Sequence, residues 1–176
     1  PQGTCTDGDG MVTVSIAGAS PPSVMTPCSG GFWLASGFDL SGIPDGSNAV
    51  VVDATQTDSY GNTGNAPTVL LDKDATPPGT PTGNALTTSD TTPVITGTAD
   101  AGAVVVVAVA GAQYTVAANG SGLWLLDTGV ITPDSGSFTP NINGSNSVTA
   151  TVTDFAGNSS IDLTDNELVI DTSDPV

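Results

Sequence analysis

Residues 97–111 have the sequence GTADAGAVVVVAVAG, and residues 3–18 have the similar sequence GTCTDGDGMVTVSIAG. Both segments begin with Gly-Thr, pass through an aspartate and a glycine, and continue into a run of small or β-branched residues that ends in Ala-Gly. β-Branched residues favour strands, whereas Asp and Gly favour turns. Each segment therefore predicts two strands joined by a turn, and their likeness predicts an internal repeat.

Four further blocks recur in the same order along the chain. They are residues 31–34 with 122–125, 46–48 with 144–146, 58–62 with 154–158, and 69–72 with 168–171. Five matched blocks in one order predict two tandem copies of one unit, an incomplete domain at residues 1–75 and a complete domain at residues 76–176. The first copy has no counterpart of residues 81–96, so we expect it to lack its leading strand.

The residue pattern within each copy is that of an all-β protein. In the second copy, short runs bounded by Gly, Asn, Asp or Pro predict strands at residues 92–98, 104–110, 113–117, 123–126, 147–153 and 167–171. Residues 147–153 alternate Val and Ala with Thr, as in a strand with one face in water. We therefore expect two tandem immunoglobulin-like β-sandwich domains. Trp33 and Trp124 occupy matched positions and are expected to fill the two cores, with ligand stacking as the alternative.

The charge of the chain is strongly unbalanced. The net charge is −17, Lys73 is the only basic side chain, Glu167 is the only glutamate, and histidine is absent. Such a surface repels phosphates and anionic lipid headgroups, which excludes nucleic acid and direct membrane insertion. Without histidine, a Ser-His or Cys-His triad is excluded, and we expect no enzyme. Aspartate favours loops and binds calcium, so the composition favours divalent cations held in loops.

Two cysteines, Cys5 and Cys28, are expected to form one disulfide, because a Gly-, Thr-, Ser- and Asp-rich, Lys-poor composition suggests export. No apolar stretch approaches the roughly 20 residues that span a bilayer. The chain begins at Pro1 without an initiator methionine, so we expect a processed or excised segment. We expect a secreted protein, extracellular or at the cell surface.

The ordered motifs resemble a known family. These motifs are Thr-Pro-x-Ile-Thr-Gly-Thr-Ala at residues 92–99, Gly-x-Trp-x-Leu, Gly-x-Asn-x-Val, Asp-x-x-Gly-Asn, and a closing hydrophobic strand that ends in Asp-Thr. Together they resemble the bacterial Ig-like tandem repeats of RTX-type and biofilm-associated giant surface adhesins. The resemblance implies repeats that bind calcium at or near domain junctions and extend an adhesive tip away from the cell. The first copy departs from the pattern in its two cysteines and its missing leading strand.

Acidic and amide side chains near the expected junction are the candidate Ca²⁺ ligands. Carboxylates and carbonyls that gather there could supply the six to eight hard oxygens that calcium prefers. The first set is Asp58, Asn62, Asp72 and Asp74, which Asp90 and Asp100 could complete, and the second set is Asp154, Asn158, Asp171 and Asp174. The alternative is that each Asp-x-x-Gly-Asn block is an Asx turn beside a solvated linker.

Three functions follow from these observations. The first is a structural extender repeat of a calcium-rigidified surface adhesin, with neighbouring repeats of the same chain as partners. The second is a subunit of a self-assembling extracellular filament, in which other copies of the protein complete the first domain by strand addition. The third is a carbohydrate-binding module, which exposed aromatic side chains would support.

Overall fold

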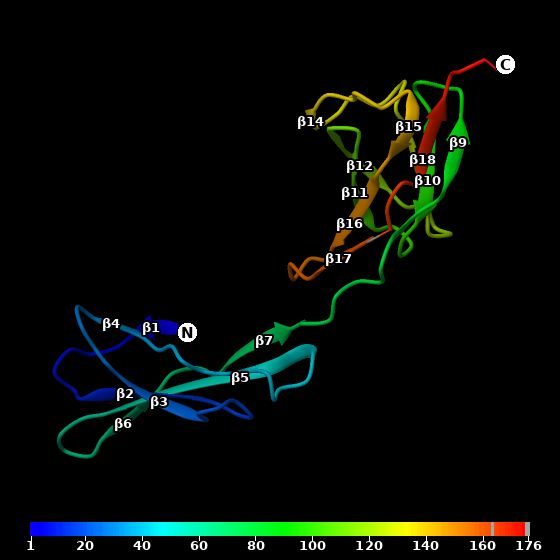
Figure 1. Cartoon of the computed structure of the whole chain (residues 1–176). Coiled ribbons are helices and arrows are strands. Elements are labelled where there is room, and N and C mark those ends of the chain that lie inside the picture. The colour runs from blue at the N-terminus through cyan, green and yellow to red at the C-terminus, as the bar shows by residue number, and fades with distance from the viewer. Residues whose placement is uncertain (163, 175–176) are drawn as a thin grey trace. The chain divides into compact units, whose positions relative to one another are not determined.

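The computed structural model describes residues 1–162 and 164–174. It divides into two compact units, Pro1–Ala75 (unit 1) and Thr76–Val176 (unit 2) (Figure 1). All regular secondary structure in the described residues is β-strand, and the chain forms β-sandwich domains, as the sequence predicts. No helix in the described part of the chain has the length and apolarity needed to cross a membrane.

Unit 2 contains eleven described strands. They are β8 (Thr82–Gly83), β9 (Leu86–Thr88), β10 (Val94–Thr98), β11 (Val104–Val109), β12 (Ala112–Ala117), β13 (Leu123–Asp127), β14 (Ser135–Gly136), β15 (Asn143–Asn146), β16 (Val148–Thr153), β17 (Ser159–Ile161) and β18 (Leu168–Asp171). One sheet has the order β14-β12-β11-β16-β17, and two smaller sheets have the orders β13-β10-β8 and β15-β18-β9. The leading segment thus contributes β8 to one small sheet and β9 to the other.

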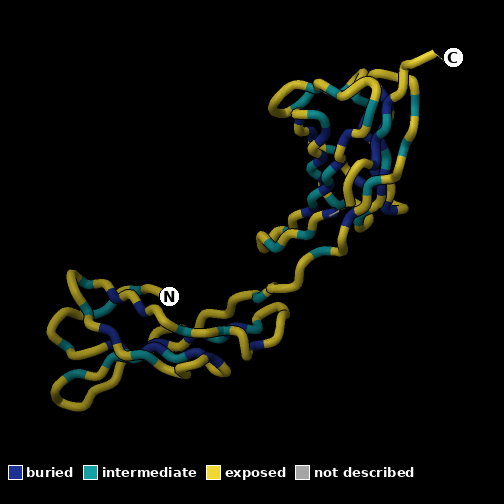
Figure 2. Tube along the Cα trace, viewed as in Figure 1, coloured by how far each residue is buried: buried dark blue, intermediate teal, exposed yellow. Residues whose placement is uncertain are grey.

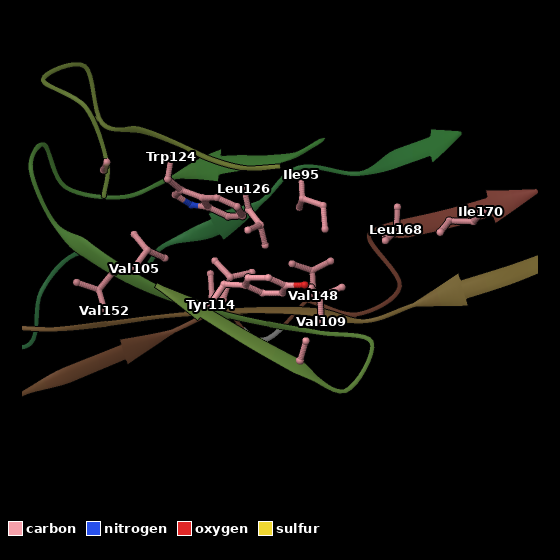
Figure 3. Close-up of a cluster of buried hydrophobic side chains, with 14 residues drawn as sticks. Ile95, Val105, Val109, Tyr114, Trp124, Leu126, Val148, Val152, Leu168 and Ile170 are labelled. Atoms are coloured by element: carbon pink, nitrogen blue, oxygen red, sulfur yellow. The ribbon is translucent and has the colours of Figure 1, made fainter. Parts of the chain in front are cut away.

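The core of unit 2 consists of aliphatic side chains together with Tyr114 and Trp124, and it lies between these sheets (Figure 3). Trp124 is 1% exposed, and its indole nitrogen donates to the Thr98 carbonyl at 3.2 Å. Its neighbour across the β10–β13 pairing is Gly97. A Cβ at Gly97 would overlap both the Trp124 ring and the Thr82 carbonyl, so this position requires glycine.

Unit 1 repeats much of this plan with fewer strands. They are β1 (Gln2–Thr4), β2 (Met11–Ile16), β3 (Ser23–Pro27), β4 (Phe32–Leu34), β5 (Gly46–Thr57), β6 (Thr63–Asn65) and β7 (Val69–Lys73). Strand β1 pairs with β4 so that Gly3 faces Trp33, as Gly97 faces Trp124 in unit 2. Strands β3, β2, β5 and β6 form one sheet, as β12, β11, β16 and β17 do in unit 2. A disulfide joins Cys5 to Cys28.

The closing strand β7 departs from the repeat. In unit 2, Leu168 lies opposite Asn146, whereas in unit 1 the aligned Val69 lies opposite Val52, four residues beyond the aligned Asn48. The connection into β7 is three residues shorter, since residues 66–69 replace residues 162–168. Strand β5 also has two more residues between the matched blocks than the aligned part of unit 2. Residues 69–71 are about half-exposed, and β7 is coloured as exposed in Figure 2.

Candidate functional site

The two Asp-x-x-Gly-Asn blocks form hairpin loops with the same hydrogen bonds. In the β5–β6 loop, Oδ1 of Asp58 accepts from the backbone N–H groups of Tyr60 at 2.8 Å and Asn62 at 2.9 Å. Oδ2 of Asp58 accepts from the Asn62 amide at 2.8 Å. Gly61 has a φ of 89°, a left-handed conformation that glycine adopts without strain.

The β16–β17 loop repeats this arrangement around Asp154. Its Oδ1 accepts from the backbone N–H groups of Ala156 and Asn158, each at 2.9 Å, and its Oδ2 accepts from the Asn158 amide at 2.9 Å. The Asn158 side-chain hydrogen bond lowers the pKa of Asp154, and the Asn62 side-chain hydrogen bond lowers that of Asp58. Both loops are therefore Asx turns whose carboxylate oxygens are already engaged within the loop.

The predicted grouping of Asp58 and Asn62 with Asp72 and Asp74 does not form in unit 1. Asp58 follows the last residue of β5, whereas Lys73 lies opposite Gly46, the first residue of β5. Strand β5 has twelve residues, so the two ends are separated by about 36 Å at a rise of 3.3 Å per residue. The register of β7 along β5 therefore places the two halves of the predicted site at opposite ends of the unit.

The same separation holds in unit 2. Asp171 pairs with Asn143 at the start of β15, whereas Asp154 and Asn158 lie beyond the end of β16, which continues β15 after one residue. Asp174 follows Asp171 by three residues in the chain, so it also belongs to the part that leaves β18. The predicted second set is thus divided between the two ends of unit 2.

Other carboxylates contact the residues that join the two units. At the end of β7, Asp45 accepts from the Lys73 ammonium at 2.6 Å and from the Ala75 backbone N–H at 3.0 Å. Asp72 accepts from the Asn48 N–H at 2.8 Å. The role of Asp45 cannot be read from the sequence, because nothing near it shows that residues 28 and 30 positions later return beside it.

In unit 2, Asp100 holds the incoming chain. Its Oδ2 accepts from the Gly79 N–H at 2.9 Å, and Ser160 donates to the Pro78 carbonyl at 2.6 Å. Asp90 precedes β10 and Asp100 follows it, so the two lie toward opposite ends of that strand. Asp90 instead accepts from the Thr92 N–H at 2.9 Å in a local turn. Of this predicted pair, Asp100 contacts the joining segment and Asp90 does not.

Two buried acidic residues that the sequence motifs do not single out hold the leading segment of unit 2, Asp162 through its carboxylate and Glu167 through its backbone carbonyl. Asp162 accepts from the Gly83 N–H and, at 3.0 Å, from the Thr164 N–H. Burial raises the pKa of Asp162, but these hydrogen bonds outweigh it and leave the pKa below its ordinary value. Glu167 accepts from the Val148 N–H at 3.0 Å, and its backbone carbonyl accepts from Leu86 at 2.6 Å. A comparison of the two copies could have pointed to Asp162, because Ala66 occupies the matched position in the first copy, which has no counterpart of the leading segment.

The described residues contain no group of three or more Asp, Glu, His or Cys side chains arranged to hold a metal ion. Several carboxylates instead lie where the chain enters or leaves a unit. We call the end of each unit that adjoins residues 74–80 its linker-side end. In unit 1 it carries Asp45, Asp72 and Asp74, and in unit 2 it carries Asp100 and the Asp154–Asn158 loop.

No protein-family model and no curated protein matches the chain. Among solved structures, it is similar to a Ca²⁺-stabilised adhesin that helps an Antarctic bacterium reach out and bind ice, at 22% identity over 92% of this chain with a TM-score of 0.46. It is also similar to a 1.5-MDa bacterial ice-binding adhesin, at 21% identity over 91% of this chain with a TM-score of 0.45. A tetra-tandem repeat in the extending region of a large adhesion protein gives 24% identity over 97% of this chain and a TM-score of 0.35. The chain spans 41%, 53% and 45% of the lengths of these three structures.

Proposed function

We propose that this chain is a structural extender of a secreted, calcium-rigidified bacterial surface adhesin, whose repeats hold an adhesive region away from the cell. The observation that carries the proposal is the path of the chain through unit 2. Pro78 and Gly79 are held at the linker-side end by Ser160 and Asp100. The chain leaves β18 at the other end, where the Thr172 N–H donates to the Asn143 side chain at 3.0 Å (Figure 1).

A unit that the chain crosses from end to end suits a linear array. Strands β15 and β16 run between those ends over residues 143–153, a span of about 33 Å at 3.3 Å per residue. Each added unit of this kind lengthens the polypeptide by its long dimension. The ordered sequence motifs, which resemble adhesin repeats, support the same role.

The charge of the chain supports calcium as the rigidifying ion. One lysine accompanies 18 acidic residues, so the folded chain carries strong self-repulsion. Asp72 precedes residues 74–80, Asp74 begins them, and Asp100 accepts from the N–H of Gly79 within them. Hard carboxylate oxygens suit calcium, and each bound ion would cancel two of the negative charges.

The test is thermal unfolding of the full chain with calcium, with magnesium and with EDTA, at one fixed ionic strength. Calcium at about 100 times its dissociation constant should stabilise the folded state by about 2.7 kcal/mol per site. The double variant Asp72→Asn/Asp74→Asn should lose part of this gain, whereas Asp90→Asn should keep it, because Asp90 lies away from the linker-side end. Calorimetric titration gives the number of ions bound. Equal melting temperatures in calcium and EDTA would remove calcium from the proposal.

A further inference from the structure

The leading segment of unit 2, residues 81–88, closes the edges of two small sheets. Strand β8 pairs with β10 through Gly83 and Gly97, and β9 pairs in parallel with β18 through Leu86 and Leu168. Pro81 is fully buried, and the partly buried Leu86 packs against the core. In unit 2, residues 81–88 therefore cover the face of the fold that β10 and β18 would otherwise leave open.

No strand within residues 1–75 covers the same face of unit 1. Among the described residues, β1 pairs only with β4, and β7 pairs only with β5. Between them lies a groove of about 420 Å³, lined chiefly by Pro1, Gly3, Trp33, Val52, Val69 and Leu71. Val69 and Leu71 are 50% and 48% exposed, whereas the aligned Leu168 and Ile170 are 1% and 0% exposed. The groove therefore combines unpaired backbone with an uncovered apolar surface.

We propose that this groove accepts one extended, uncharged peptide segment with the chemistry of residues 81–88. The segment would add as a strand along β1 and place an aliphatic side chain, in the role of Leu86, beside Val69, which aligns with the Leu168 partner of Leu86. Trp33 and Leu71 line the same groove. Backbone pairing and apolar contact carry the binding, because Ala66 stands where Asp162 anchors Gly83 in unit 2. The net charge of −17 selects against an acidic donor, and residues 80–88 contain no charged side chain.

The test adds a synthetic peptide of residues 80–89, TPTGNALTTS, to the full chain carrying Trp124→Phe, so that Trp33 reports alone. Binding should saturate at one peptide per chain, shift Trp33 emission to shorter wavelength, and slow amide exchange in β1 and β7. The same peptide with Leu86→Asp, and the acceptor variant Leu71→Asp, should each weaken binding at least about tenfold. The inference is independent of calcium binding, and runs in calcium and in EDTA separate its failure from that of the proposed function.

A covalent version of the experiment does not depend on the affinity of a separate peptide. Residues 76–94 are fused ahead of Pro1, in the register that places Gly3 where Gly97 stands, and unit 1 should then unfold at a higher temperature. Sedimentation of the unfused chain tests whether another copy donates the segment. Self-association that the added peptide reverses would support the proposal that the groove binds such a segment. The proposal is overturned if about 1 mM peptide leaves Trp33 emission and amide exchange unchanged, and the fusion leaves the unfolding of unit 1 unchanged.

Discussion

Truncating Ile170 to alanine should destabilise unit 2 much more than truncating the aligned Leu71 destabilises unit 1. Ile170 is 0% exposed, and removing three carbon groups at about 0.8 kcal/mol each, plus the cost of a cavity, gives about 3–4 kcal/mol. Leu71 is 48% exposed, so about half of the transfer free energy applies, and solvent fills the space. Its truncation should cost about 1 kcal/mol.

Urea denaturation followed by tryptophan fluorescence measures both values. Trp33→Phe leaves Trp124 to report on unit 2, and Trp124→Phe leaves Trp33 to report on unit 1. Leu125→Ala is the matched control in unit 2, because Leu125 is 54% exposed and its truncation should also cost about 1 kcal/mol. Equal losses for Ile170→Ala and Leu71→Ala would show that the open groove does not exist in solution, and would refute the burial argument.

Three other outcomes follow from single features. Replacing Cys5 and Cys28 by serine should lower the stability of unit 1 by about 3 kcal/mol, measured by urea denaturation, and leave unit 2 unchanged, because the disulfide closes a loop with a sequence separation of 23 within unit 1. Asp154→Ala should lower the melting temperature at neutral pH. The difference from the wild type should shrink in a pH series as the pH falls through the folded-state pKa of Asp154, which lies below the ordinary value of 3.8. A difference that stays constant with pH would contradict this role. Tyr114→Phe should leave the melting temperature of unit 2 unchanged or raise it, by a stabilisation of up to about 1 kcal/mol. The reason is that the buried hydroxyl has no hydrogen-bond partner among the described residues.

The amino-acid sequence alone determined the features that depend on local interactions. The valine run of β11 and the alternation of β16 specify strands without help from distant residues. The Asx turns at Asp58 and Asp154 are equally local, because each carboxylate bonds to groups two and four residues ahead. Comparing the two copies also indicated that residues 1–75 contain no counterpart of residues 81–96.

Only the tertiary structure decided where the acidic side chains lie relative to one another. Asp58 and Asp72 are 14 residues apart in the sequence, yet β7 returns along β5 and places them at opposite ends of unit 1. Asp45 meets Ala75, and Asp162 meets Gly83, across 30 and 79 residues. Such contacts depend on strand register and on the lengths of strands and connections. In unit 1, a connection three residues shorter and two extra residues in β5 between the matched blocks together shift the start of β7 by four positions. Strand register is set by pairing between distant segments, so matching the two copies residue by residue could not reveal it.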